Sequence, residues 1–298
     1  FSIYIGTVGG GLWRSPDEGT TWTRIMYPLP TEGNYRALCV YPDNSHRILA
    51  GSDSGLFRSE DEGVTWQDLH LSVDDIQIWS ISVDPVDSNT IFVGTRPDAF
   101  RSTNGGKTWQ RLSLGVANPC VIGTPRTTMI IVDPRDHLTI WAGIEVDGVY
   151  KSMDGGDTWV HLPDLGSDSY HGDIHGMGIG IGQPTTIYAT SPFGIAASTD
   201  EGESWRWHEF PKYSGTDGYK NQDWSYCRGM AIKADDPNVI FVGHGDTIPG
   251  QIGDIQRSTD GGHTWSAANL PINPNSVMYW FGTHPAIPEV IVATSIYG

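Results

Sequence analysis

One eight-residue pattern recurs six times along the chain and limits its possible folds more than any other feature. It reads S-x-[DN]-x-G-x-[ST]-W without exception, and its copies span residues 15–22, 59–66, 102–109, 152–159, 198–205 and 258–265. The intervals between successive copies are 44, 43, 50, 46 and 60 residues. A period in the forties, with strand-like segments between the copies, is typical of the blades of a β-propeller.

The residue types in this pattern suit a tight turn between two strands. An Asp or Asn side chain can accept hydrogen bonds from nearby backbone N–H groups, and Gly adopts backbone angles that a Cβ would oppose. The Ser and Thr hydroxyls can satisfy further polar groups of the turn, and Trp begins the next strand with a large apolar surface to bury. We therefore expect each copy to join the last two strands of a blade and to be structural, not a calcium or ligand site.

The segments around the copies predict the number of blades. An inner strand such as 79–83 runs into an Asp-Pro turn, and an apolar second strand follows; comparable second strands lie at 3–6, 48–51, 90–94, 140–143, 187–189, 240–243 and 290–293. The fold class is therefore all-β, a single propeller domain over 1–298 with seven four-stranded blades, or six as the alternative. The first blade lacks its inner strand, and the last is incomplete because it stops after its second strand. We expect residues beyond Gly298 to complete it.

The composition limits the partners. Acidic residues outnumber basic ones by 35 to 18, which gives a net charge of −17. Binding to nucleic acid needs clustered Lys and Arg, so we expect no nucleic-acid partner. No stretch approaches the roughly 20 apolar residues of a membrane span, so we expect no membrane insertion. Because the chain opens at Phe1, a leader can have been removed, and a secreted or periplasmic location is favoured over the cytoplasm.

The six copies resemble those of the BNR/Asp-box repeat proteins, among them sialidases, xyloglucan-cleaving endoglucanases, sortilin-type receptors and photosystem II stability factors. The resemblance implies a β-propeller and no particular function, because enzymes, receptors and assembly factors all use this repeat. Sialidases carry an Arg-Ile-Pro motif before the first copy, which this chain lacks. The xyloglucan enzymes hold two catalytic Asp residues between two propellers, and this chain is long enough for only one propeller. No single member is matched.

The long loops predict where a site would lie. They cover 112–126, 162–173, 207–226 and 244–254, all on the propeller face opposite the repeated turns. Loops of this length are uncommon unless they are functional. Aligning the inner strands by their exit pattern places one residue of each at the mouth of a central channel: Arg36, Trp79, Thr128, His175, Arg228 and Tyr279. Two positions earlier come Asn34, Gln77, Arg126, Asp173 and Tyr226.

These residues predict a funnel that acts on a small anionic or saccharide-like molecule. Arginines can clamp a carboxylate, sulfate or phosphate, and a histidine can transfer protons near neutral pH. The predicted catalytic residues are His175, Asp173, Tyr226 and Tyr279, and the predicted substrate-binding residues are Arg36, Trp79, Arg126, Arg228, Trp224 and His244. The set suits a hydrolase of the glycosidase kind, or a lyase that eliminates from a uronate while an Arg stabilises the enolate.

Two alternatives stay open. The polar groups can simply satisfy one another in a non-catalytic scaffold of the stability-factor or sortilin type, which would bind a protein or ligand through exposed Trp207, Trp224 and Trp280. No cofactor is predicted. A divalent metal is the minor alternative and would need residues of different blades, such as His175 and His244, because His171 lies about 13 Å from His175 along a strand.

Overall fold

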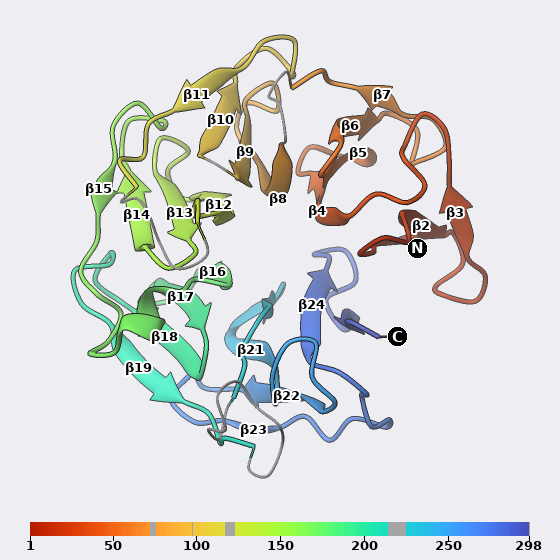
Figure 1. Cartoon of the computed structure of the whole chain (residues 1–298). Helices are drawn as coiled ribbons and strands as arrows, with labels where there is room; N and C mark the ends of the chain where they lie inside the picture. The colour runs from red at the N-terminus through yellow and green to blue at the C-terminus, as the bar shows by residue number, and fades with distance from the viewer. Residues whose placement is uncertain (72–75, 97, 117–122, 214–224, 298) are drawn as a thin grey trace. The chain divides into compact units, whose positions relative to one another are not determined.

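The computed structural model of the chain describes residues 1–71, 76–96, 98–116, 123–213 and 225–297. The regular structure in these ranges is almost entirely β, with 25 strands and one short 3-10 helix (Figure 1). The strands form seven sheets in which each strand pairs with its neighbours in sequence. Among the described residues, no helix has the length and apolar character needed to cross a membrane.

The first sheets follow the order of the chain. The first holds β1 (Ile3–Gly6), β2 (Leu12–Ser15) and β3 (Thr23–Ile25). The second holds β4 (Tyr35–Tyr41), β5 (Asn44–Ser52), β6 (Gly55–Ser59) and β7 (Gln67–Asp68). The third holds β8 (Gln77–Val83), β9 (Ile91–Arg96), β10 (Ala99–Ser102) and β11 (Gln110–Leu112). The fourth holds β12 (Thr127–Val132), β13 (Ile140–Ile144), β14 (Gly148–Ser152) and β15 (Val160–His161).

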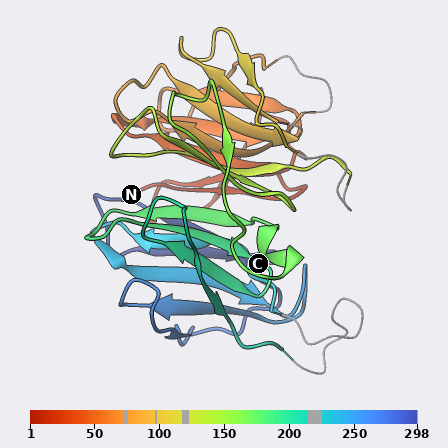
Figure 2. The ribbon, with the colours of Figure 1, turned by 90° about the vertical axis from the view of Figure 1, so that its left-hand side faces the viewer.

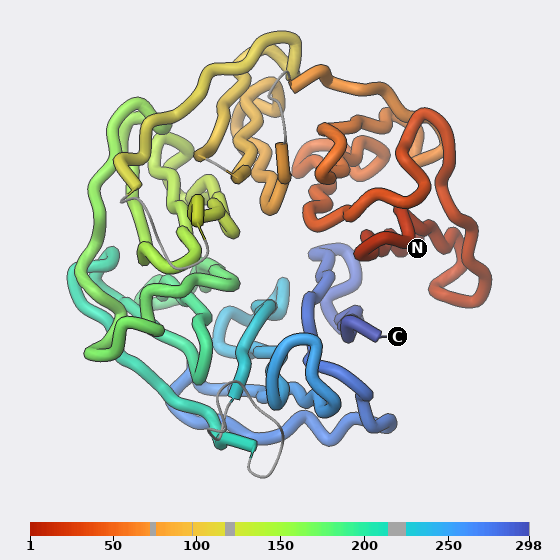
Figure 3. The backbone as a smooth tube through the Cα atoms, in the orientation of Figure 1, coloured from red at the N-terminus to blue at the C-terminus, as the bar shows by residue number. Residues whose placement is uncertain are grey.

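The remaining sheets repeat this plan after the 3-10 helix η1 (Ser169–Gly172). The fifth holds β16 (Gly176–Gly180), β17 (Thr186–Ser191), β18 (Gly194–Ser198) and β19 (Arg206–Glu209). The sixth holds β20 (Met230–Lys233), β21 (Asp236–Gly245), β22 (Gly253–Ser258) and β23 (Ser266–Ala267), and the last holds β24 (Met278–Thr283) and β25 (Ile291–Ser295). The tube in Figure 3 shows this back-and-forth course within each sheet.

The sheets confirm the predicted seven-bladed β-propeller fold. Every predicted second strand exists, as β1, β5, β9, β13, β17, β21 and β25. The first sheet has three strands and the last has two, as the sequence predicts for the two incomplete blades. The loop predicted at 244–254 is shorter than expected, because His244 pairs with Asp254 and extends the hairpin of β21 and β22. The connection is therefore 246–252.

The chain divides into two compact units, which we describe separately. Unit 1 comprises residues 1–142 and 150–160, and unit 2 comprises 143–149 and 161–298. In unit 1, β8 packs against β4 and β12, and the buried side chains of Leu49, Ile78 and Ile91 contribute to one core cluster. In unit 2, β20 packs against β16 and β24, and Tyr188 and Val242 belong to a corresponding cluster. Figure 2 shows the sheets of unit 2 that run from β16 to β25, coloured from green to blue.

The repeated turns form as the sequence predicts. In the copy at 59–66, the Ser59 hydroxyl donates to Asp61 Oδ1 at 2.9 Å and accepts from the Gly63 N–H at 2.7 Å. Asp61 also accepts from the Thr65 N–H at 2.8 Å and from its hydroxyl at 2.6 Å. The Trp66 indole N–H donates to the Gly63 carbonyl at 3.0 Å. Since every polar atom named here is used inside the turn, each copy closes the hairpin between the last two strands of its sheet.

Candidate functional site

Five of the predicted site residues meet in unit 2 because they occupy matching places on three neighbouring strands. Asp173 and His175 precede β16, Tyr226 and Arg228 precede β20, and Tyr279 is the second residue of β24. Residues two apart in an extended chain point to the same side. The extended approach to each strand therefore directs both members of a pair to one side. We call these five residues the proton-transfer cluster.

His175 lies at the centre of this cluster and has a defined tautomer. Its side chain is buried, and Nδ1 lies 2.7 Å from the carbonyl oxygen of Cys227. Because a carbonyl only accepts, Nδ1 must carry the proton. Nε2 then faces Asp173 Oδ2 at 3.4 Å and the Tyr226 hydroxyl at 3.5 Å. Nε2 of His175 thus lies between a carboxylate and a phenol, where it can take up a proton or donate one to Asp173.

Burial opposes the ionisation of both neighbours of His175, but their net pKa shifts have opposite directions. Burial opposes ionisation of Asp173, but the charge and hydrogen bond of His175 and the charge of Arg228 outweigh it and lower the pKa of Asp173. Burial raises the pKa of Tyr226 to about 12, although Arg228 acts in the opposite direction. Near neutral pH, Asp173 is therefore an acceptor and Tyr226 a proton donor.

Arg228 supplies a buried positive charge beside this pair. Its Nη2 donates to the Tyr279 hydroxyl at 2.9 Å, and its Cζ lies 4.9 Å from the centre of the Tyr279 ring. Burial opposes the charge of Arg228, but the Tyr279 and Tyr226 hydroxyls and the Glu145 carboxylate raise its pKa above the ordinary value. Because the Tyr279 oxygen accepts from Arg228, its own O–H is left to donate to another group.

Sequence analysis missed Glu145. This residue follows β13, is 6% exposed and acts electrostatically on both Arg228 and Tyr226. It was missed because the alignment considered only residues that enter the inner strands and not residues that follow the second strands. The sequence signal that could have identified Glu145 is a charged residue directly after an apolar strand, in Gly143-Ile144-Glu145.

His244 lies in a different network from the proton-transfer cluster. Its Nδ1 is 3.2 Å from the Ser225 hydroxyl, and its Nε2 is 3.2 Å from the side-chain nitrogen of Gln256. Since an amide nitrogen donates, Nε2 accepts and the ring is neutral. Burial lowers the pKa of His244 to about 4. His244 is therefore poorly suited to bind an anion through a positive charge.

Three other predicted residues meet in unit 1, and we call them the cation–aromatic cluster. The guanidinium carbon of Arg36 lies 4.7 Å from the centre of the Trp79 ring, and that of Arg126 lies 4.6 Å from it. The Trp79 ring thus contacts two positive charges. Guanidinium groups stay charged at any physiological pH, so this cluster can attract an anion but cannot exchange protons with it.

The remaining predictions have mixed outcomes. Trp224 lies outside the described residues. Trp207 and Trp280 are half-buried and not exposed as expected, because Trp207 stacks on His171 with ring centres 3.9 Å apart and Trp280 packs against Gly229. In the part of the chain that the structure describes, no three His, Cys, Asp or Glu side chains gather closely enough to hold a metal ion.

Comparisons with protein families agree with the repeat. The model described as "Photosynthesis system II assembly factor YCF48" matches residues 20–164, and the BNR/Asp-box repeat model matches residues 256–267. No curated protein matches the chain by sequence.

Solved structures of several functions share the fold. The GH74 xyloglucanase from Xanthomonas campestris aligns with a TM-score of 0.71 at 18% identity, over 99% of this chain and 49% of its own. A YCF48 structure with a bound D1 peptide aligns with a TM-score of 0.63 at 16% identity, over 93% of this chain and 82% of its own. A chain of a nidogen/laminin complex aligns with a TM-score of 0.59 at 13% identity, over 94% of this chain and 96% of its own.

This chain spans about half the length of the xyloglucanase. At these identities the likeness extends to the fold and not to an activity. The repeated turns, the sheets that they join and both family models nevertheless agree, and the chain belongs to the superfamily of β-propellers built from BNR/Asp-box repeats, with no single member matched.

Proposed function

We propose that unit 2 carries an acid–base site for a small anionic or saccharide-like molecule. The observation that supports this most strongly is the orientation of His175. The Cys227 carbonyl holds its Nδ1–H, which leaves Nε2 between Asp173 and Tyr226. A base held next to a protonated phenol and a permanent positive charge is the arrangement that proton-transfer catalysis requires.

Each residue of the cluster then has a role. Arg228 binds a carboxylate of the substrate and stabilises the negative charge that develops on it. His175 Nε2 takes a proton from water in hydrolysis, or from the carbon next to the carboxylate in β-elimination. Tyr226 or Tyr279 donates a proton to the leaving oxygen, and Asp173 stabilises the His175 cation. The raised pKa of Tyr226 keeps its proton in place until the leaving group needs it.

The second candidate is a scaffold that binds an acidic peptide. Two observations favour it. The YCF48 family model covers residues 20–164, which include the cation–aromatic cluster, and one aligned YCF48 structure holds a D1 peptide. Arg36 and Arg126 would then pair with carboxylates of the peptide, with Trp79 as the aromatic anchor.

The test is incubation with sialosides, uronate oligosaccharides, lactones and sulfated sugars, with and without divalent metal, followed by mass spectrometry. A gain of one water identifies a hydrolase, and an unsaturated product identifies a lyase. The matched variant is His175→Asn, whose amide can still donate to the Cys227 carbonyl but cannot transfer a proton. Turnover that survives in His175→Asn contradicts the proposal, and no turnover of any substrate favours the peptide scaffold.

A further inference from the structure

Unit 2 contains a cavity that lies far from His175. Its volume is about 410 Å³, which is in the range of pockets that hold small molecules. It lies where the turn after Gly180 faces the start of β21 and the repeated turn at 258–265. His175 precedes β16, whereas Gly180 ends it, and five residues of strand span about 16 Å. The cavity shares no lining residue with the proton-transfer cluster, so the inference below does not depend on the proposed function.

The cavity coincides with an exception in the repeat. The residue directly before the first Ser is Ala197 in the copy at 198–205, whereas it is basic in the other five copies: Arg14, Arg58, Arg101, Lys151 and Arg257. Arg58 donates to the Gly105 carbonyl at 2.8 Å, and Arg101 donates to the Gly155 carbonyl at 2.6 Å. Each of these bonds ties one sheet to the repeated turn of the next.

In the fifth sheet, the neighbouring strand supplies this bond. Ala197 pairs with Arg206 of β19, and Arg206 Nη1 donates to the Gly262 carbonyl at 2.8 Å. The contact with the next turn is therefore kept, while the space that a long side chain at position 197 would fill stays open. Ala197 and Arg206 both line the cavity.

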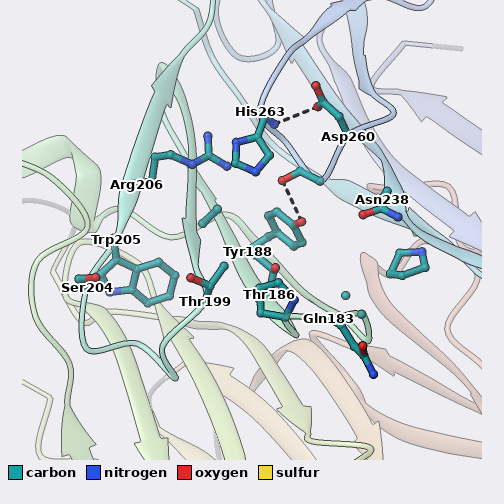
Figure 4. A pocket seen from close by; sticks show the side chains of 16 residues that line it. Gln183, Thr186, Tyr188, Thr199, Ser204, Trp205, Arg206, Asn238, Asp260 and His263 are labelled. Carbon is teal, nitrogen blue, oxygen red and sulfur yellow. Dashed lines mark hydrogen bonds between the residues drawn. The ribbon is translucent and has the colours of Figure 1, made fainter.

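Several side chains around the cavity can both donate and accept hydrogen bonds. Gln183 and Asn238 carry amides and Thr199 carries a hydroxyl, and all three side chains are exposed. Figure 4 shows Gln183 and Asn238 on one side of the cavity and Thr199 on the other. Because the indole nitrogen of Trp205 is buried, this residue adds apolar surface to the lining and no hydrogen-bond donor.

Arg206 and Asp260 give the lining one positive and one negative charge. Arg206 uses Nη1 for Gly262, and its other N–H groups can donate to a ligand. Asp260 stays ionised because hydrogen bonds from Thr264 and Ser258 lower its pKa, and Oδ2 keeps a lone pair beside the one that accepts from the Thr264 hydroxyl. An anion is attracted by Arg206 but repelled by Asp260, and the reverse holds for a cation. A hydroxyl group, in contrast, can donate to Asp260 or accept from Arg206.

We propose that this cavity binds an uncharged saccharide of one or two pyranose rings. Because each hydroxyl of a sugar both donates and accepts, one ring can donate to Asp260 and accept from Arg206. Hydrogen bonds to charged groups are stronger than those between neutral groups. Further hydroxyls can pair with the amides of Gln183 and Asn238, and the carbon atoms of the ring can contact the apolar surface of Trp205.

The experiment follows the side-chain N–H resonances of Gln183, Asn238 and Arg206 in ¹⁵N-labelled protein. The protein is titrated with D-glucose, cellobiose, D-glucuronate or D-glucosamine at a mildly acidic pH, where glucosamine is a cation. We expect glucose and cellobiose to shift these resonances with millimolar dissociation constants. Glucuronate and glucosamine should bind no more tightly than glucose, because the attraction to one charge of the lining is opposed by the other.

Two variants and a matched control test the cavity itself. Ala197→Arg restores the residue type of the other copies and should abolish binding by filling the cavity. Gln183→Ala removes one hydrogen-bonding amide and should weaken glucose binding about two- to tenfold. Gln251→Ala is the control, because Gln251 is an exposed glutamine of unit 2 that does not line the cavity. It should bind glucose as the unaltered protein does.

The proposal is overturned if neither glucose nor cellobiose shifts the resonances, or if Ala197→Arg binds them with unchanged affinity. It is also overturned if a charged sugar binds at least about tenfold more tightly than glucose, because the cavity would then recognise a charge. If Ala197→Arg does not fold, the comparison of Gln183→Ala with Gln251→Ala decides. Binding of glucose by His175→Asn should be unchanged, which separates this cavity from the proposed catalytic site.

Discussion

The cation–aromatic cluster of unit 1 and the proton-transfer cluster of unit 2 occupy equivalent places on inner strands but differ in chemistry. Arg36 and Arg126 contact Trp79, and this cluster contains neither a carboxylate nor an imidazole. In unit 2, a histidine of known tautomer lies between a carboxylate and a phenol, beside Arg228. The difference teaches that one repeat can place permanently charged groups or titratable groups at equivalent positions, depending on which residues enter the inner strands.

The largest effect that distinguishes the two clusters should be on turnover. For a substrate found in the panel, His175→Asn should lower kcat about 10²- to 10⁴-fold, because a positioned acid or base contributes about that much. Arg36→Gln in unit 1 should leave both kcat and KM nearly unchanged, because the proposed site lies in unit 2. Steady-state kinetics of both variants measure this. If Arg36→Gln lowers kcat as much as His175→Asn does, the division of roles between the clusters is wrong.

The next effect should be on stability. Arg228→Met leaves the carboxylates of Glu145 and Asp173 without their buried counter-charge, and should lower the free energy of unfolding by about 3–5 kcal/mol. Arg126→Met in unit 1 loses a contact with Trp79 from a half-buried position, and should cost about 1 kcal/mol. Urea denaturation followed by circular dichroism measures both. Equal losses would show that the two arginines have similar surroundings.

A third prediction concerns pH. Burial lowers the pKa of His244 in unit 2 to about 4, so the unfolded chain takes up a proton between about pH 6.5 and 4 while the folded protein does not. The free energy of unfolding should therefore fall as the pH falls through this window, by up to about 3 kcal/mol. Denaturation at several pH values measures this slope, and His244→Asn should remove it.

His137 in unit 1 provides the opposite case. Its hydrogen bond and charge interaction with Asp84 raise its pKa, so its contribution to stability is present at low pH and is lost as the pH rises through the folded pKa. His137→Gln should remove only this contribution and leave the slope due to His244. A slope that persists in His244→Asn would assign the pH dependence to other groups.

The smallest effect should come from the ring between the two arginines. Trp79→Phe keeps an aromatic face but a weaker one, and should lower the free energy of unfolding by about 1 kcal/mol or less. Thermal unfolding of this variant beside Tyr279→Phe compares the two clusters directly, because Tyr279→Phe also removes the hydroxyl that accepts from Arg228. The Tyr279 variant should lose more. A greater loss in Trp79→Phe would reverse this order.

The sequence by itself determined the strands, the turns and the number of sheets, because these depend on groups close together in the chain. Asp17, for example, accepts from the backbone and hydroxyl of Thr21 only four residues later, and every copy repeats this geometry in outline. Aligning inner strands even selected the residue pairs before β16 and β20 that meet in unit 2. Such regularities can be read directly from spacing.

Only the tertiary structure decided which polar groups meet and in what state. The proton position on His175 depends on the Cys227 carbonyl, 52 residues away. The role of Glu145 and the open space beside Ala197 likewise depend on how one sheet packs on the next. The neutral state of His244 depends on its burial, and the Gln256 amide that donates to it lies on another strand. Contacts between strands and between sheets follow from side-chain packing, which has no period in the sequence, and this is why the chemistry of the site became visible only in the folded chain.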